Sequence, residues 1–436
     1  MRSQLPRHFV FAGMCLLPFV FGSAPASASS VPTPEAFIEL VSKSPLLATD
    51  AASADIARAR LDEALSALRP RLTGRLDGKR FSSMRAAESR DSDVLGSLEI
   101  IQPVYDFGKS SNSIDAARAD VRVQDRDRKI RAGTLILEGV ALYYELHASD
   151  LEVQALEEEN TIAFFVAARL EEKDALGDAN PIDLLEARAN RDLARYNYFK
   201  AKGNNLGIRL RLEELSGLAF KETTLTPDVP DVQAINIDSE KVIALTRDAY
   251  PLLLSLKEKR EALLARSRSA GFSPQIEAYG RVSESTRNLR GRDDWSVGAR
   301  MIVPLYDGGK GASEKAQWMA RLRHLDARIA EMERGLVRNT HLALLARSNA
   351  RLRLTAARTA YKAGRQRLLL EQLQRSQDRE ASVGGASARI GHIETELVRA
   401  IGAWRIAGLR LASMLGRPLG ESFASNFLED LKIVDQ

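Results

Sequence analysis

One ten-residue motif occurs twice in the chain, about 200 residues apart. "QPVYDFGKSS" occupies residues 102–111 and "VPLYDGGKGA" occupies residues 303–312, so proline, tyrosine, aspartate, glycine and lysine recur at an offset of 201. Upstream, "SPLLATD" at 44–50 matches "YPLLLSL" at 250–256. Solenoid repeats have periods of about 20 to 50 residues, so a repeat of this length indicates one duplicated structural unit. The chain therefore consists of two copies of one plan.

The N-terminus has the pattern of a secretory signal peptide. Arg2 and Arg7 precede an apolar run from Phe9 to Phe21, and small residues follow. The apolar run is shorter than the ~20 residues of a membrane-spanning helix. The single cysteine, Cys15, lies inside this run, so the exported chain has neither thiol catalysis nor thiolate metal sites. The predicted organisation is a signal peptide at 1–28, a first repeat at 29–217, a linker at 218–240, a second repeat at 241–416 and a C-terminal tail at 417–436.

A pair of strands precedes each copy of the motif. The expected strands are 71–81 and 95–104 in the first repeat, and 274–283 and 295–304 in the second. Apolar and polar residues alternate in them, which is typical of strands with one apolar face. Their length of about ten residues matches a tilted strand that crosses a bilayer. Taken alone, the strands favour an ordinary soluble hairpin packed on a core, and it is the helices that reverse this judgement.

Long proline-free segments follow each motif. Helices are expected over 108–175 and 309–382, and each would measure ~100 Å at 1.5 Å per residue. No globular core of this size is that long, so the helices must pack lengthwise against partners. Glycine turns lead into return helices at 179–216 and 386–415. Apolar residues repeat along these return helices at coiled-coil spacing: Ile182, Leu185, Ala189, Leu193 and Tyr196 in the first, and Ile390, Ile393, Leu397, Ala400, Trp404, Ala407, Leu411 and Met414 in the second.

The duplicated motif is interpreted as a junction between a strand and a helix. Proline cannot donate a ladder hydrogen bond, aspartate can cap the first free amides of a helix, and glycine permits a sharp change of direction. A nucleotide site is excluded, because a phosphate-binding loop needs glycine where Pro103 stands, and the second copy has Gly311 in place of the magnesium-binding hydroxyl. The predicted junction residues are Pro103, Tyr105, Asp106 and Gly108, and Pro304, Tyr306, Asp307 and Gly309.

Four strands are too few for a membrane barrel, which needs about eight or more, and lipid cannot satisfy the open edges of a sheet. Strands from several protomers must then combine, and a conducting pore favours at least three protomers, because eight strands enclose only side chains. The predicted fold class is mainly α with a small β part, internally duplicated, with long helical hairpins and two β-hairpins. The formal net charge of +5 is too small and too dispersed to indicate nucleic-acid binding.

These features together resemble the TolC-type outer membrane factors of Gram-negative bacteria. The resemblance rests on the signal peptide, the duplication, "PVYDFGK" and "PLYDGGK" after strand hairpins, and "LGDANPIDLLEARA" at 176–189. It implies a homotrimer in outer membrane lipid, in which four strands per chain form a 12-stranded barrel and the helices form a periplasmic tunnel. It also implies passive export, with a periplasmic adaptor and a proton-driven or ATP-driven inner-membrane pump as partners.

The resemblance also assigns site residues. Leu176 with Gly177 and Val383 with Gly384 match the hairpin tips where adaptors dock. Acidic residues line the periplasmic entrance in the family, and Asp183 matches in the first repeat. In the second repeat the aligned position is Gly391 or Ile390, neither of which is acidic, and Glu394 lies nearby. Glu394 is therefore expected either to join an acidic ring at the entrance or to lie on a solvated helix face.

Three other protein classes fit the sequence less well. A periplasmic adaptor needs only one helical hairpin, and an envelope coiled-coil scaffold without a pore leaves the strands unexplained. An exported enzyme is disfavoured because the histidines are scattered outside any metal-binding spacing and were expected mostly on helix surfaces: His8, His147, His324, His341 and His392. No catalytic residue, cofactor or metal is predicted.

Overall fold

The structure is a computed structural model, and two helices of 67 residues run along the molecule. They are α3 (Lys109–Ala175) and α7 (Lys310–Ser376). At 1.5 Å per residue each is ~100 Å long, as the sequence predicts. The structure describes residues 33–80, 92–220, 230, 238–271, 273–286, 295–376 and 383–424, so the predicted signal peptide and most of the predicted linker lie outside the described residues.

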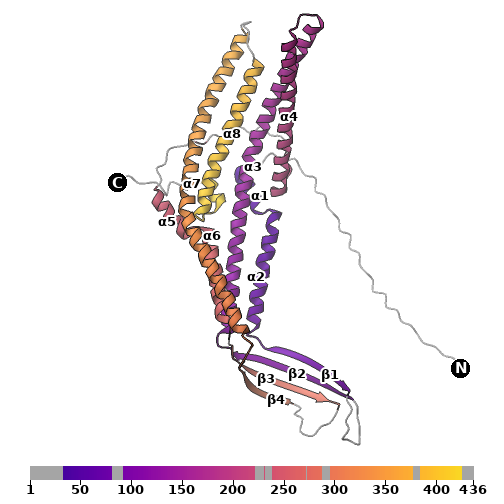
Figure 1. Ribbon diagram of the computed structural model, residues 1–436, viewed down its shortest axis with the longest axis vertical. Coiled ribbons are helices and arrows are strands. Elements are labelled where there is room, and N and C mark those ends of the chain that lie inside the picture. The colour runs from indigo at the N-terminus through magenta and orange to yellow at the C-terminus, as the bar shows by residue number, and fades with distance from the viewer. Residues whose placement is uncertain are drawn as a thin grey trace, which may run out of the picture.

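Shorter helices complete a layer around this pair. On one half of the molecule the lateral order is α4 (Pro181–Ser216), α3, α8 (Val383–Met414) and α7. On the other half it is α2 (Ala48–Ser66), α3, α6 (Pro251–Ser269) and α7 (Figure 1). The two repeats thus contribute equivalent elements to a layer four helices wide. Smaller helices lie near the middle: α1 (Pro34–Ser42), the 3₁₀ turn η1 (Pro45–Leu47), α5 (Ser239–Ala249) and α9 (Leu419–Ala424).

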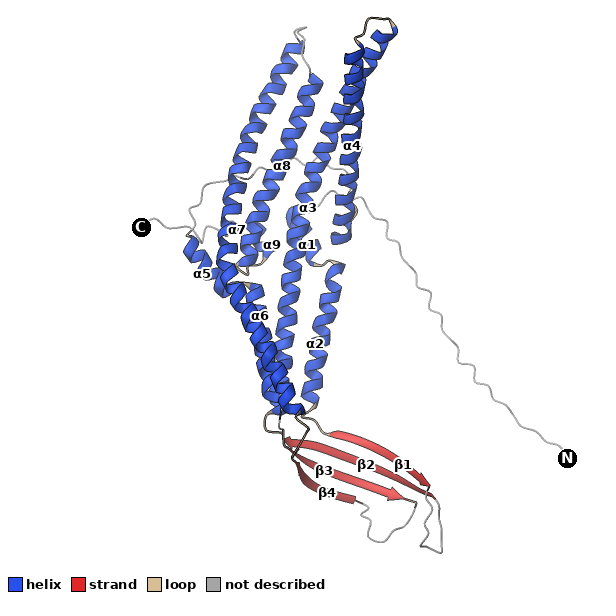
Figure 2. Cartoon of the chain, in the orientation of Figure 1, coloured by secondary structure: helices blue, strands red, loops and turns tan. Residues whose placement is uncertain are grey.

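A single antiparallel sheet lies at one end of the helices (Figure 2). Its order is β1 (Arg71–Arg80), β2 (Ser92–Tyr105), β3 (Gln275–Ser285) and β4 (Trp295–Ile302). Each repeat supplies one hairpin, and β2 pairs with β3 across the repeats. The predicted fold class, long helical hairpins with four strands from two β-hairpins, is confirmed. Within the described chain, the outer edges of β1 and β4 have no neighbouring strand.

The core lies at the middle of the helical layer, where the short helices meet α3 and α8. Phe37 of α1 is fully buried and its ring centroid lies 5.5 Å from that of Tyr143. Leu146, Leu212 and Leu411 are fully buried around the same place. Each side chain of this size contributes roughly 1.5–3 kcal/mol on burial. This core, called the waist core below, holds both repeats together at one level.

His147 is an exception to the expected surface placement of the histidines. It is 5 % exposed on α3 and its ring lies 4.7 Å from that of Tyr143. Burial, together with the charge of Arg209, lowers the pKa of His147 to about 4. Neither ring nitrogen has a hydrogen-bond partner among the described residues. The imidazole is therefore neutral at pH 7 and fills the waist core as an aromatic side chain.

The two predicted coiled-coil stripes differ in burial. On α8 the stripe is buried as predicted, since Leu397, Ala400 and Leu411 lie in the interior. On α4 the expected seam is wrong within one chain, because Ile182, Leu185, Leu193 and Tyr196 are exposed. The physical reason is position: α4 is the outermost helix of its layer and contacts α3 through a different face. One apolar face of α4 has no partner among the described residues of this chain.

The start of α8 also differs from expectation. Val383 and Gly384 were expected in a glycine turn before a helix beginning at residue 386, but both lie in the first turn of α8. Glycine adopts helical dihedrals at modest cost, so it need not end a helix. The connection between α7 and α8, at 377–382, lies outside the described residues.

Gly402 provides a test of the close packing between α8 and α3. A Cβ at Gly402 would lie 2.6 Å from Cβ of Tyr144, so Gly402→Ala should destabilise the fold by about 1–3 kcal/mol through overpacking. Gly335 of α7 is the matched control, because the nearest atom that a Cβ there would meet is a guanidinium nitrogen of Arg338 at 4.0 Å. Gly335→Ala should stabilise by about 0.5–1 kcal/mol through helix propensity. Thermal unfolding of the purified variants measures both, and a Gly402→Ala protein as stable as the parent contradicts the packing argument.

Candidate functional site

The sheet carries one continuous apolar face. Residues opposite each other in neighbouring strands share a face, and the register places Leu72 opposite Ile100, Leu98 opposite Val282, and Val282 opposite Trp295. These side chains are exposed, as is Val297 at 77 %. An apolar surface of this extent marks contact with another protein or with a membrane.

The opposite face of the sheet is charged. Arg281 donates to Glu99 at 3.0 Å, and Arg300 pairs with Glu277 at 2.8 Å. Arg300 also lies over the ring of Tyr279, 5.4 Å from its centroid. Sequence reasoning named none of these residues as a site, although the period-2 alternation that predicted the strands already placed them together on the polar face.

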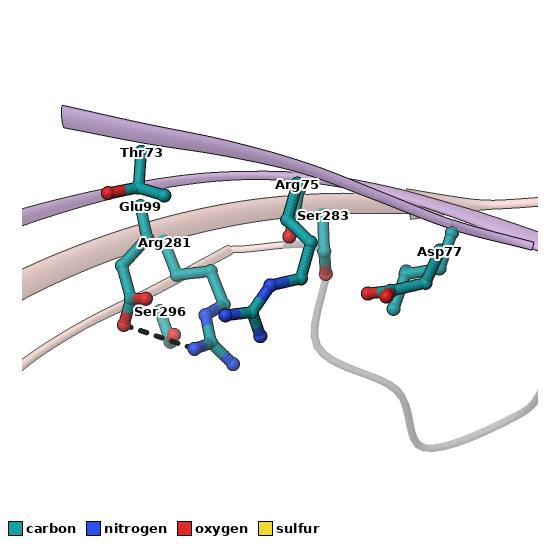
Figure 3. A pocket seen from close by; sticks show the side chains of 9 residues that line it. Thr73, Arg75, Asp77, Glu99, Arg281, Ser283 and Ser296 are labelled. Carbon is teal, nitrogen blue, oxygen red and sulfur yellow. Dashed lines mark hydrogen bonds and ion pairs between the residues drawn. The ribbon is translucent and has the colours of Figure 1, made fainter.

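A pocket of about 270 Å³ opens on this polar face (Figure 3). The guanidinium groups of Arg75 and Arg281 both reach it, and Glu99 lies beside Arg281 as its ion-pair partner. Arg75 has no ion pair or side-chain hydrogen bond within the described parts of the chain. The lining residues are Thr73, Arg75, Asp77, Leu95, Ser97, Glu99, Arg281, Ser283 and Ser296.

The two junctions share one geometry. Oδ2 of Asp106 accepts a hydrogen bond from the Ser110 amide at 2.7 Å, and the equivalent oxygen of Asp307 accepts one from Gly311 at 2.7 Å. Gly108 and Gly309 have φ of +87° and +85°, a left-handed conformation that side chains disfavour. Each aspartate thus caps the first turn of a long helix directly after the chain turns out of the sheet.

The prolines and tyrosines of the junctions are less alike than the sequence suggests. Pro304 follows the end of β4, but Pro103 lies inside β2, opposite Glu277, so the prediction that it ends the ladder is wrong. Beyond Ile101 the described residues pair β2 with β3 but no longer with β1, so on one side of the strand there a missing amide hydrogen costs no ladder bond. Both tyrosines are exposed, Tyr105 at 55 % and Tyr306 at 89 %, but Tyr105 ends β2 and packs on Phe107 with 4.8 Å between ring centroids.

The first hairpin tip lies at the far end of the helices from the sheet (Figure 1). Gly177 has φ of +79°, and the Asp178 amide donates back to the Lys173 carbonyl at 2.9 Å, a helix-ending Schellman turn. Leu176 is 75 % exposed at this tip. Asn180 caps the returning α4 by accepting from the Ile182 amide at 3.0 Å.

The two acidic entrance candidates are not brought together. Asp183 is exposed in the first turn of α4, whereas Glu394 lies about three turns into α8. Helix α3 lies between α4 and α8 (Figure 1). Glu394 is half-buried and burial raises its pKa, an effect opposed by the charge of Arg365. This half-buried position disagrees with the alternative expectation of a solvated helix face.

Two further observations concern the described parts of the chain alone. No three side chains of histidine, cysteine, aspartate or glutamate gather there in an arrangement that could hold a metal ion. None of the helices described there is long and apolar enough to cross a membrane.

Comparison with known proteins relates the chain to outer membrane channels. Residues 39–218 match the outer membrane efflux protein family, and no curated protein sequence matches the chain. The Campylobacter jejuni CmeC outer membrane channel aligns with a TM-score of 0.69 and 18 % identity, covering 92 % of this chain and 89 % of that chain. The Vibrio cholerae outer membrane protein VceC aligns with a TM-score of 0.63 and 16 % identity, covering 88 % and 96 %.

A third solved structure extends the likeness to an open channel. The open state of the Neisseria gonorrhoeae MtrE outer membrane channel aligns with a TM-score of 0.58 and 18 % identity, covering 89 % of this chain and 90 % of that chain. The predicted resemblance is therefore confirmed: the chain has the fold of the TolC-type outer membrane factors, and its residues 39–218 match the outer membrane efflux protein family.

Proposed function

We propose that the protein is the outer membrane channel of a tripartite efflux or type I secretion system. In this proposal it is a passive trimeric conduit from periplasm to exterior. The observation that carries the proposal is the sheet: four strands with two open edges, one apolar face and one charged face, joined directly to helices of ~100 Å.

The sheet supports a pooled barrel. Lipid offers no hydrogen-bond partner to an open strand edge, so β4 of one protomer would pair with β1 of the next. Three protomers with four strands each give a 12-stranded ring, whereas two would give eight strands and an interior filled by side chains. The apolar face, with Leu72 and Trp295, would then face lipid, and the charged face would line a water-filled pore.

The helices support the same symmetry. The outermost helices of the layer on the side away from the sheet are α4 and α7, and both expose apolar side chains. A ring of three copies would bring α7 of one protomer against α4 of the next and cover both stripes. The exposed residues are Ile182, Leu185, Leu193, Tyr196, Phe199, Leu206 and Leu210 on α4, and Leu342, Leu345, Leu352, Leu369 and Leu370 on α7.

The protein would work with a periplasmic adaptor and an inner-membrane pump. The channel itself needs no catalytic residue or cofactor, because the pump would supply the energy from protons or from ATP. The barrel would lie in the outer membrane of a Gram-negative bacterium, with the helices in the periplasm. A periplasmic adaptor or an envelope scaffold without a pore would account for the helices, but either would leave the exposed apolar face of the sheet without a role.

The hairpin tips are the proposed docking sites for the adaptor. Leu176 and Gly177 form one tip, and Val383 and Gly384 begin the returning helix of the other. The exposure of Leu176 gives an adaptor an apolar contact. Asp183 would stand at the periplasmic entrance, and Glu394, further from its own tip, would stand deeper in the tunnel.

The channel proposal predicts both location and conductance. Fractionation should place the mature protein in the outer membrane, and purified oligomers should conduct ions across a planar lipid bilayer. The charged face of the sheet is the physical reason, since it would line an aqueous path. A periplasmic monomer that inserts into no bilayer would refute the proposal.

The docking proposal predicts a loss of export without a loss of assembly. Leu176→Asp should abolish export in cells, because a charge replaces the exposed apolar contact at the tip, while the protein still assembles at normal abundance. Leu176→Met retains an apolar side chain and is the matched control. Export assays beside native gels measure both properties, and normal export by Leu176→Asp would remove the docking role.

A further inference from the structure

The polar face of β1 carries cations at every second position of that face. Arg71, Arg75 and Lys79 lie there, with Asp77 as the one acidic residue of β1 on this side of the sheet. None of the three cations forms an ion pair within the described residues. On β3 and β4, by contrast, Arg281 and Arg300 are paired with Glu99 and Glu277. The positive charge of the polar face is therefore concentrated and uncompensated on one strand.

The register brings one of these cations to the pocket of Figure 3. Arg75 lies opposite Ser97, which in turn lies opposite Ser283, while Arg281 lies opposite Glu99 in the adjacent row. Arg75 and Arg281 stand on β1 and β3, two strand spacings apart across β2 and offset by two residues along the strands, which places their backbones ~12 Å apart. Long arginine side chains span this separation, and both guanidinium groups line the same pocket.

The acidic residues nearby are already engaged or lie apart from Arg75. The Glu99 carboxylate lies 3.0 Å from Arg281 and 3.8 Å from Arg300. Asp77 lies at the other end of the pocket and forms no ion pair with Arg75 (Figure 3). A neighbouring protomer would not supply the missing carboxylate through the described part of β4, whose residues on this face are Ser296, Gly298, Arg300 and Ile302.

Hydroxyl groups complete the lining. Thr73, Ser97, Ser283 and Ser296 line the same pocket as the two guanidinium groups. Arginine binds carboxylate, sulfate and phosphate groups through paired N–H donors, and hydroxyl groups add further donors. The pocket volume of about 270 Å³ accommodates such a group with part of its carrier.

We propose that this pocket is an oxyanion-binding site of the pore, in which Arg75 and Arg281 hold carboxylate, sulfate or phosphate groups of passing solutes. The inference rests on the proposed channel function and adds a substrate class to it. Three copies of Arg75, one from each protomer, would also raise the local concentration of anions in the pore. The channel would then prefer anions over cations and would be occupied transiently by oxyanions.

Planar-bilayer recordings of the full-length oligomer test this inference. Under a KCl gradient the reversal potential should report a chloride preference, and Arg75→Gln should lower the chloride-to-potassium permeability ratio about twofold or more. Arg80→Gln removes the same charge from the opposite face of the same strand and should leave the ratio unchanged. Added inorganic sulfate should reduce the current of the parent channel at lower concentration than that of Arg75→Gln.

A third variant separates charge from geometry. Arg75→Lys should retain the chloride preference but lose most of the sulfate block, because an ammonium group cannot make the paired contacts of a guanidinium. A cation-selective parent channel, or equal sulfate block in the parent and Arg75→Gln, would overturn the oxyanion site. A protein that conducts no current at all would instead refute the channel function, so the two failures are distinguishable.

Discussion

An unpaired strand edge is not stable in a hydrocarbon environment, and the proposed channel depends on this constraint. Every amide and carbonyl in a bilayer needs a protein partner, because lipid offers none. The sheet leaves β1 and β4 as open edges while it presents an apolar face fit for lipid. In the proposed channel one chain alone would leave both edges unpaired, and copies arranged in a ring would pair them. The duplication, the junctions and the layer of helices would all serve this proposed ring.

The junctions connect each strand hairpin directly to a long helix. At each one, an aspartate caps a 67-residue helix directly after a left-handed glycine. The orientation of each long helix is thus fixed within a few residues of the sheet. Midway along, the waist core binds α1, α3, α8 and α9 together and prevents the two repeats from separating. Beyond it, α4 and α7 extend with exposed apolar faces that another copy can cover.

Much of this plan could be predicted from the sequence. The repeat at an offset of 201, the strand alternation and the proline-free segments led to the correct fold class. The prediction that the apolar stripe of α4 is buried within the chain is wrong, because apolar spacing shows that a helix has a face to bury but does not identify its partner. The prediction that Pro103 ends the strand ladder is wrong, because the effect of a proline on a ladder depends on which side of the strand has a neighbour. The prediction of a turn at Val383 and Gly384 is wrong, because glycine is compatible with the first turn of a helix.

The charged face of the sheet was predictable in part. Alternation placed Arg75, Glu99 and Arg281 on one side, but the pairing of Glu99 with Arg281 depends on the register between repeats, which no local pattern encodes. His147 was missed for a related reason, since only the assembled waist core determines which face of α3 is interior.

The central claim is that β4 of one protomer pairs with β1 of the next in a closed ring of three. Disulfide trapping tests it directly, because the one native cysteine, Cys15, lies in the predicted signal peptide. A cysteine replaces Val297 in β4, and a second replaces Leu72, Gly74 or Leu76 in β1, all on the apolar face. For at least one pair, non-reducing gels should show a covalent trimer that a reducing agent converts to monomers. Monomers and dimers alone, for every pair, would contradict the closed ring.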